Sequence, residues 1–397
     1  MRPTPVGLAL SLALAVVGMT AFPAQAGGTN DRATPLPRVA SIFDDVGEGS
    51  WAAAAISYVA QEHAWMRDFG RDVFRPARTE SRSLFARALA RAFAKGDEPE
   101  DEPAFSDLPK SDRRYPSAAL VVERGWMTTS PGGAFRPDDP VTTVEVHTGL
   151  LKALRLRREL EGLDTIATTD GVALDHDRGF APMALGMVIG LRLDHDRDAI
   201  DVRPKTELSR AEVAYSLWRA HQTLSVSSWK IRDAAAYRTI TLGRLGPRLR
   251  AMTEFGLASV GQPYQWSAEW PSATPSGYCC GPQTTGGFDC SGIVWWAMRN
   301  DEGGYDAASI RGFAGWSLPQ RSSRDMASVG KRLSFRETRP GDLLFFDGTG
   351  DGVVDHVSIS LGRGWALDAS DSYGGVSVIR VGSGWYRERF THGRRII

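Results

Sequence analysis

A single cysteine stands where a chain can make a sulfur nucleophile. Cys290 lies between Asp289 and Ser291 in a Gly-Phe-Asp-Cys-Ser-Gly segment, and the apolar run 293–298 follows directly. If that run is a helix, Cys290 falls in its first turn, where free backbone N–H groups and the helix dipole favour thiolate over thiol. The alternative is a buried structural cysteine, which is common, so the interpretation depends on a base elsewhere in the chain.

Two alternating segments near the C-terminus supply a base and an orienting group. Polar and apolar residues alternate over 355–361, which predicts a strand with His356 on its polar face. After a three-residue turn, 365–370 alternates again and predicts the hairpin partner. If the strands pair directly across that turn, Asp368 becomes the diagonal neighbour of His356 on the same face. A cysteine nucleophile needs such an imidazole to take and return the proton, and a polar group to orient the imidazole.

Other polar groups of this region are weaker candidates. His392 lies in a polar tail beside arginines and is expected to be solvated, and Asp355 should point away from the His356 face. The glycine-rich segment 347–352 followed by Asp355 is similar to the start of a calcium loop, but Ser358 stands where the twelfth, acidic position would be. A plain turn is therefore preferred, and no metal or cofactor is expected.

The composition is that of a folded, exported protein. The chain has 397 residues, enough for two or three domains, and 47 basic against 47 acidic side chains give no indication of nucleic-acid binding. The uncharged run 6–22, followed by Ala24-Gln25-Ala26, predicts a secretory signal over 1–26. A membrane anchor is the alternative, but the run is short and no basic cluster follows it. We expect no anchor to remain after the signal is removed.

The three cysteines are consistent with one working thiol. Cys279 and Cys280 are adjacent within 267–287, a Pro, Gly, Ser and Thr-rich stretch that is expected to be a long surface loop. Any disulfide leaves one thiol over, and Cys290 fits that place. A bridge between Cys279 and Cys280 and two free thiols are both compatible with the sequence.

Three similar units precede this region. Each has a Phe/Val-Arg-Pro turn that leads into a run with apolar residues at helical spacing. The turns lie at 74–76, 135–137 and 202–204, and the runs at 84–93, 144–154 and 213–220. Each unit is too small to bury a core of its own, which predicts an all-α module made of three packed copies.

Residues 41–222 resemble three S-layer homology repeats, at about 41–95, 103–155 and 164–222. The family's Thr-Arg-Ala-Glu signature is nearly intact as Ser-Arg-Ala-Glu around Arg210, keeps only Arg82 in the first copy, and has lost its arginine in the second. The resemblance implies a module that grips anionic cell-wall polysaccharide through Arg82 and Arg210, since a guanidinium binds a carboxylate bidentately. A purely scaffolding role for these helices is the alternative.

Residues 248–397 resemble the NlpC family of cell-wall peptidases, which share a papain-like core. The domain is expected over 246–397, after a linker at 223–245. Six family features occur in order: Pro-Tyr-x-Trp at 263–266, Phe-Asp-Cys-Ser-Gly at 288–292, Leu-Pro at 318–319, Pro-Gly-Asp-Leu at 340–343, His-Val-x-Ile at 356–359, and a polar residue after a short hairpin, Asp368. The resemblance implies an α+β fold with an antiparallel sheet, following the all-α repeat module.

The resemblance also implies the catalytic roles. Cys290, His356 and Asp368 would form the triad, and Tyr264 would help to bind the oxyanion or the thiolate. The third position is more often histidine in the family. An aspartate orients the imidazole equally well and stabilises the imidazolium more.

The implied substrate is the stem peptide of peptidoglycan, cut between D-glutamate and diaminopimelate by a secreted protein held at the surface of a bacterium. Asp289 and Ser291 match family positions that contact the substrate's amino end. Two alternatives remain open: a non-catalytic wall-binding or structural protein, and an amidase or acyltransferase on the same fold.

Overall fold

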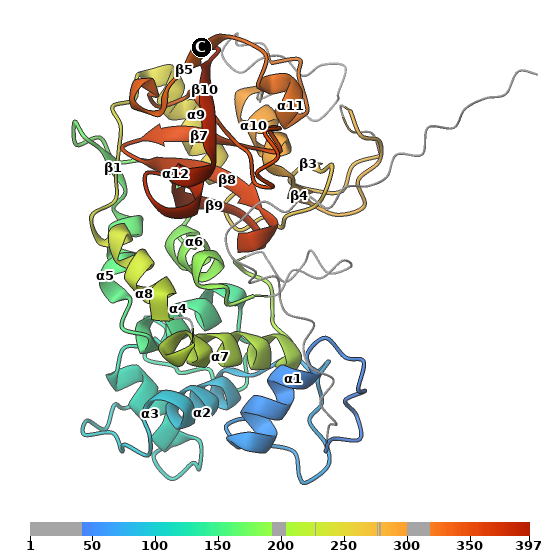
Figure 1. Cartoon of the computed structure of the whole chain (residues 1–397). Helices are drawn as coiled ribbons and strands as arrows, with labels where there is room; N and C mark the ends of the chain where they lie inside the picture. Colours follow the sequence, from blue (N-terminus) through green and yellow to red (C-terminus); the bar gives the residue numbers. More distant parts are fainter. Residues whose placement is uncertain (1–41, 193–203, 227, 276, 278, 300–317) are drawn as a thin grey trace, which may run out of the picture.

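The chain folds into a helical N-terminal module and an α+β C-terminal module (Figure 1). The structure, a computed structural model, describes residues 42–192, 204–226, 228–275, 277, 279–299 and 318–397. The expected signal at 1–26 and two residues of the third turn, Val202 and Arg203, lie outside the described residues. None of the described helices is long and apolar enough to cross a membrane. The predicted fold class, a helical module followed by an α+β domain, is confirmed.

The helical module contains the predicted helix pairs. In chain order its helices are α1 (Ala53–Ile56) with the π-helical turn η1 (Ser57–Glu62), α2 (Arg82–Phe93), α3 (Tyr115–Glu123), α4 (Thr143–Ala153), α5 (Arg157–Asp164), α6 (Phe180–Ile189) and α7 (Arg210–Ser225). Capping residues explain where the second helix of each pair begins: Ser81, Thr142 and Ser209 occupy the N-cap positions. The third pair begins at α6 rather than near residue 164, where α5 ends.

The three helix pairs close into a ring. The first N–H groups of α2, α4 and α7 each donate to backbone carbonyls just after the Arg-Pro turn of the next pair, so the donors that a helix start leaves open find partners. The pairs are Arg82 with Asp139, Ser83 with Pro137, Thr143 with Thr206, Val144 with Pro204, Arg210 with Arg78, and Ala211 with Pro76, at 2.8–3.0 Å. The first pair contacts the second, the second the third, and the third the first. This arrangement supports the prediction of three mutually packed repeats.

The two signature arginines lie inside this ring. Arg210 is 0% exposed; its Nε donates to the carbonyl of Phe74 at 2.8 Å and its Nη1 lies 2.6 Å from a carboxylate oxygen of Glu80. Arg82 is 2% exposed, donates through Nε to the carbonyl of Phe135 at 2.8 Å, and forms an ion pair with Glu145. Each guanidinium therefore ties down the Arg-Pro turn of the next repeat. Both guanidiniums are buried and bonded within the module, so neither is exposed to a polymer in this structure, and their part in gripping one stays a prediction.

The C-terminal module is a six-stranded antiparallel sheet with helices on both faces. Its strands, in spatial order, are β5 (Lys331–Leu333), β10 (Phe390–Arg395), β6 (Leu343–Phe346), β7 (His356–Gly362), β8 (Trp365–Ser370) and β9 (Gly375–Arg380). Its helices are α9 (Pro247–Leu257), α10 (Cys290–Arg299), α11 (Ser323–Met326) and α12 (Gly384–Arg389). Helix α10 packs against β7 and β8, whereas Tyr386 of α12 joins a separate apolar cluster with Leu344 and Phe346. Because Val357 and His356 alternate along β7, the two helices cover opposite faces of the sheet.

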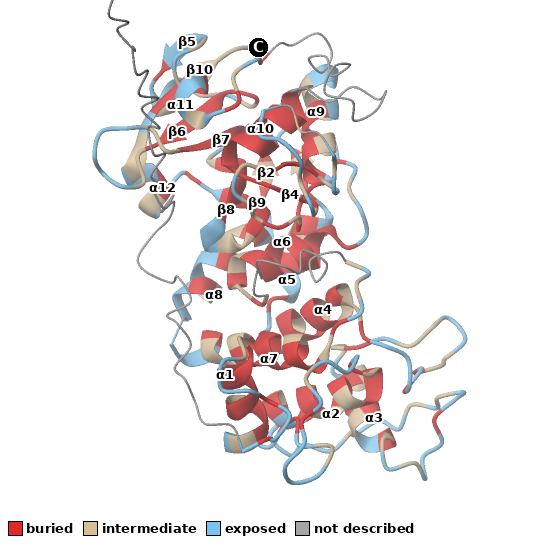
Figure 2. Cartoon of the chain, turned by 90° about the vertical axis from the view of Figure 1, so that its right-hand side faces the viewer, coloured by how far each residue is buried: buried red, intermediate tan, exposed pale blue. Residues whose placement is uncertain are grey.

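The expected linker at 223–245 is instead folded. It contains α8 (Ser228–Ala234), the 3-10 turn η3 (Ala235–Thr239) and β2 (Thr241–Leu242), which pairs with β1 (Ala167–Thr168). The Tyr237 hydroxyl donates to the carbonyl of Val378 in β9 at 2.6 Å, and Ser377 of β9 donates to the carbonyl of Ala184 in α6 at 3.3 Å. One apolar cluster runs through both modules, as the continuous buried zone in Figure 2 shows. The polar composition that suggested a linker belongs to a packed junction.

We expect Arg210→Met to lower the free energy of unfolding by about 3 kcal/mol, because it leaves Glu80 buried without its partner. Chemical denaturation followed by tryptophan fluorescence measures this loss. Arg244→Ala is the matched control, since that side chain is 83% exposed and its removal should change stability by less than about 0.5 kcal/mol. Equal effects of the two substitutions would contradict a structural role for Arg210.

Candidate active site

Cys290 is the first residue of α10, as predicted. The Asp289 side chain caps this helix: its Oδ1 accepts the backbone N–H of Gly292 at 2.6 Å. Cys290 is a free thiol and is 7% exposed. The sulfur thus lies at a helix N-terminus, where backbone N–H groups favour the thiolate.

His356 and Asp368 meet on the β7–β8 hairpin. The strands pair with Ile359 opposite Leu367, which is the predicted register and makes Asp368 the diagonal neighbour of His356. Next to the turn the prediction of direct pairing is wrong, because a register shift places Gly362 opposite Trp365. The imidazole Nε2 lies 2.7 Å from Asp368 Oδ1, and both side chains are buried. His356 also hydrogen-bonds Cys290. Since Nε2 faces the carboxylate, Nδ1 is the nitrogen left for the thiol. The structure therefore brings the three predicted triad residues together.

His356 and Asp368 each stabilise the charged form of the other. Burial works to lower the pKa of His356, but the carboxylate of Asp368 and the contacts with Cys290 outweigh it and raise that pKa well above its ordinary value. Burial works to raise the pKa of Asp368, and His356, Ser358 and Tyr386 together bring it below its ordinary value. A protonated imidazole beside an ionised carboxylate is the state that stabilises a neighbouring thiolate.

Tyr264 lies beside the start of α10. Its backbone N–H donates to the carbonyl of Gly374 at 3.1 Å, and it forms a parallel bridge with Phe288. Burial, and then the nearby charges of Cys290 and Asp289, raise the pKa of its phenol. The phenol therefore remains an O–H donor. Its part in binding an oxyanion stays a prediction.

Asp289 and Ser291 are held by an arginine that the sequence analysis did not single out. Arg321 donates through Nη1 to Asp289 Oδ1 at 2.9 Å and to Ser291 Oγ at 2.8 Å, and its Nε lies 2.5 Å from Glu269 Oε2. All four side chains are buried. Asp289 and Ser291 thus have internal partners at the base of the site, and contact with a substrate's amino end stays a prediction.

The described residues of the stretch 267–287 make more backbone and side-chain hydrogen bonds than expected of a surface loop. Its ends pair as β3 (Glu269–Trp270) and β4 (Gly287–Phe288). The Gln283 amide bridges the stretch, accepting from the backbone N–H of Glu269 at 3.0 Å and donating to the carbonyl of Trp270 at 2.9 Å. Tyr264 and the start of α10 border this segment along the chain, one on each side.

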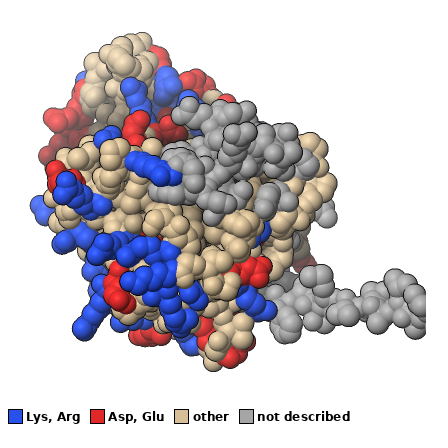
Figure 3. Space-filling model, turned by 90° about the horizontal axis from the view of Figure 1, so that it is seen from above, with Lys and Arg blue, Asp and Glu red and all other residues tan. Residues whose placement is uncertain are grey.

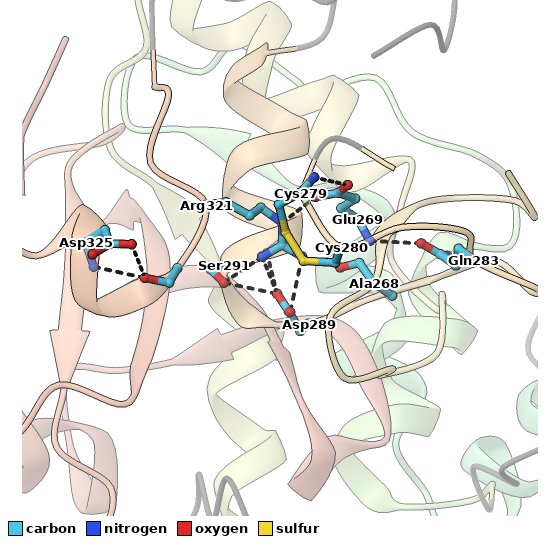
Figure 4. Close-up of a disulfide and its surroundings, with 11 residues drawn as sticks. Ala268, Glu269, Cys279, Cys280, Gln283, Asp289, Ser291, Arg321 and Asp325 are labelled. Carbon is cyan, nitrogen blue, oxygen red and sulfur yellow. Dashed lines mark hydrogen bonds and ion pairs between the residues drawn. A yellow bond between two sulfur atoms is a disulfide. The ribbon is translucent and has the colours of Figure 1, made fainter. Parts of the chain in front are cut away.

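The adjacent cysteines form a disulfide, which decides between the two possibilities left by the sequence. Cys279 and Cys280 are bonded, and the backbone N–H of Cys279 donates to Glu269 Oε1 at 3.1 Å. Figure 4 shows the disulfide beside Arg321 and Asp289. The two sulfurs and a Glu269 oxygen lie within 4.8 Å of one another, but sulfurs joined to each other offer no thiolates to a metal.

Two other expectations concern polar groups of the C-terminal module. His392 is 6% exposed, and its Nε2 lies 3.1 Å from the carbonyl of Ala327, so the expectation of a solvated histidine is wrong. Asp355 accepts the backbone N–H groups of Gly348 and Thr349, so its carboxylate is directed at the glycine-rich turn. The glycine-rich segment is thus folded as a turn around its own carboxylates.

Two further residues of the site, Ser358 and Tyr386, were not predicted from the sequence. Ser358 Oγ donates to Asp368 Oδ1 at 2.5 Å, and the Tyr386 hydroxyl donates to Asp368 Oδ2 at 3.0 Å. Ser358 stands on the same strand face as His356, so alternation alone carried a signal for it. Nothing in the local pattern around Tyr386 indicated that α12 would reach the hairpin.

Comparison with known proteins finds two family matches along the chain. Residues 261–395 match the NlpC/P60 family, and residues 104–142 match the S-layer homology domain. The chain therefore carries an NlpC/P60 domain, and a helical region with an S-layer homology domain precedes it in the sequence.

Several of the relatives that match are named as endopeptidases. The bifunctional muramidase/DL-endopeptidase CwlT of Bacillus subtilis is 32% identical over 137 residues, which cover 34% of this chain and 33% of that protein. The peptidoglycan endopeptidase RipB of Mycobacterium tuberculosis is 35% identical over 124 residues, covering 31% of this chain and 44% of that one. This chain thus spans less than half the length of either relative.

A solved structure of RipD from Mycobacterium tuberculosis, described as a non-catalytic NlpC/p60 domain protein, is 27% identical with a TM-score of 0.28, and the match covers 38% of this chain and 100% of that one.

Asp368→Asn should lower the pKa of His356, because burial would then act without the opposing carboxylate. In the wild-type protein the raised pKa means that the imidazolium stabilises the fold below the unfolded-state pKa, and that this stability is lost as the pH rises through the folded-state pKa. NMR titration of the His356 ring measures the shift. Asp371→Asn, at an exposed position, is the control. Unchanged titration in Asp368→Asn would show that the carboxylate does not control the imidazole.

Proposed function

We propose that this protein is an exported cell-wall hydrolase that cuts peptide bonds of peptidoglycan with Cys290 as its nucleophile. The observation that carries the proposal is the hydrogen-bonded series from Cys290 to His356 to Asp368, with the sulfur at a helix N-terminus. The names of the relatives support the substrate class, since they include peptidoglycan endopeptidases.

The proposed reaction is acyl transfer. The Cys290 thiolate attacks a peptide carbonyl, and the backbone N–H of Cys290 with the hydroxyl of Tyr264 stabilises the oxyanion. The His356 imidazolium gives its proton to the leaving amine, which departs as the thioester forms. Water, deprotonated by His356, then hydrolyses the thioester and restores the thiolate.

The proposed bond joins D-glutamate to diaminopimelate in the stem peptide. That bond runs from a D-residue to the L-centre of the next residue. The name of CwlT, a DL-endopeptidase, supports this choice. Asp289 and Ser291, at the entrance of α10, are the proposed contacts for the amino side of the peptide.

The repeats are proposed to hold the protein on an anionic polymer of the cell wall. The match to an S-layer homology domain supports surface association. Because Arg82 and Arg210 are buried, the polymer is proposed to contact other groups of the module. Figure 3, seen from the C-terminal module, shows lysine and arginine side chains gathered on one side of that end, which adds attraction to an anionic wall.

Purified peptidoglycan should be cleaved by the wild-type protein and left intact by Cys290→Ala, because the variant has no nucleophile. Mass spectrometry of the soluble products identifies the new termini and hence the bond. Ser372→Ala, at an exposed position, is a control expected to cleave normally. Equal release by the wild-type protein and Cys290→Ala would reject the proposal. Products cut at the junction between glycan and peptide would indicate an amidase instead, and products that carry a transferred acyl group would indicate an acyltransferase.

The full chain should sediment with cell walls that keep their secondary polymers and remain soluble with walls stripped of them by hydrofluoric acid. The physical reason is that the stripped walls have lost the anionic polymer that the repeats are proposed to bind, and keep only the weaker charge of the stem peptides. Cys290→Ala is the form to use, so that cleavage does not release the protein. Equal sedimentation with both kinds of wall would show that the polymer is not what the repeats recognise.

A further inference from the structure

The carboxylate of Asp368 is held at both oxygens by groups outside the predicted triad. Asp368 is 0% exposed. Its Oδ1 accepts from His356 and from Ser358, and its Oδ2 accepts from Tyr386. A carboxylate without access to water stays ionised only when its oxygens receive hydrogen bonds or face a positive charge. One imidazolium satisfies part of this need, and the two hydroxyls supply the rest.

We propose that Tyr386 and Ser358 are positioning residues for the reaction at Cys290. They keep Asp368 ionised and fixed in orientation, and through it they keep His356 protonated and directed at the thiol. The inference rests on the proposed function insofar as Cys290 is the nucleophile. It adds two residues outside the triad: Tyr386, which lies outside the six family features, and Ser358, which stands at the unspecified position of the His-Val-x-Ile segment.

Tyr386 reaches the site from the face of the sheet opposite α10. It is 5% exposed, and its ring lies 5.2 Å from the ring of Phe346 and 6.0 Å from that of His356, between centroids. The phenol thus packs against the imidazole while its hydroxyl bonds the carboxylate. Burial and the nearby charge of Asp368 raise the pKa of Tyr386 well above its ordinary value, so the hydroxyl remains a donor.

Ser358 acts from the neighbouring strand. Because Ile359 pairs with Leu367, Ser358 stands directly across from Asp368. Its hydroxyl lies 2.5 Å from Oδ1, the oxygen that also faces His356. With Ser358 on one oxygen and Tyr386 on the other, the carboxylate cannot turn about its Cβ–Cγ bond without breaking a hydrogen bond.

Tyr386 and Ser358 affect the Cys290 thiol through the proton that it shares with His356. In the active state the proton of Cys290 is on His356, and Asp368 carries none. If a lost donor raised the proton affinity of Asp368, the imidazolium would be less stable and the sulfur would hold its proton to higher pH. Substrate contacts would not change, since both hydroxyls are turned to the carboxylate and neither is on the sulfur side of the imidazole.

The test is the pH profile of Cys290 alkylation by iodoacetamide in the full chain, which needs no wall substrate. Cys279 and Cys280 are bonded to each other, and Cys290→Ala shows which label belongs to Cys290. We expect Tyr386→Phe to move the profile upward by about one pH unit and to lower kcat about tenfold with KM unchanged.

Tyr237→Phe is the matched control. It also removes a buried hydroxyl, but one that bonds the carbonyl of Val378 at the junction, so both readouts should stay at wild-type values. Ser358→Ala should shift the profile in the same direction as Tyr386→Phe. It also decides the question if circular dichroism shows that Tyr386→Phe does not fold.

In the Asp368→Asn background, adding Tyr386→Phe should have no further effect on alkylation, since the charge through which it acts is gone. Profiles of Tyr386→Phe or Ser358→Ala that coincide with the wild-type profile would overturn the inference, as would an equal effect of Tyr386→Phe with and without Asp368. A shifted profile in a protein that releases nothing from peptidoglycan would support the positioning role and reject the proposed function.

Discussion

The pair formed by His356 and Asp368 is the interaction on which the C-terminal module depends. Two groups that carry charge sit in the middle of a sheet, with no water to solvate them. Such a pair costs stability unless every remaining hydrogen-bonding position is filled. The hairpin register, the serine on β7 and the placement of α12 on the far face all meet that requirement. The helix that presents Cys290 covers the other face, and the thiol meets the one imidazole nitrogen that the carboxylate leaves open.

Three buried arginines hold together segments that are distant along the chain. Arg82, Arg210 and Arg321 each join segments that are distant along the chain, by donating to carbonyl groups and carboxylates together. A guanidinium suits this because its five donors point in fixed directions and can satisfy an irregular turn and an acid at once. In the repeats, Arg82 and Arg210 close the ring of helix pairs. Beside the candidate active site, Arg321 joins Asp289, the cap of α10, to Glu269 of β3.

The sequence was informative wherever the determining contacts are local. Alternation with a short turn predicted the β7–β8 register and hence the Asp368 contact, and an apolar run after Asp289 predicted the helix that begins at Cys290. Prediction failed for partners far apart. The acids that bind Arg321 lie 32 and 52 residues away, so no spacing rule pointed to it. The family signature suggested an external ligand for Arg210, because burial by another repeat is invisible in its own segment. The prediction for His392 failed for the same reason, since its polar neighbours in sequence belong to a strand, β10, whose pairing with β6 buries the imidazole.

The folded junction at 223–245 sets the geometry of any work done at a surface. A catalytic domain on a loose tether samples a volume whose radius grows with tether length. Here Tyr237, Ser377 and the β1–β2 pair join the two modules, so these contacts hold the candidate site at a set position relative to the repeats. Under the proposed function, an enzyme anchored through the repeats would reach only bonds at a constant height above its anchor. Each anchoring position would limit it to a small set of bonds, and it would reach others only after the whole molecule had dissociated and bound at another position.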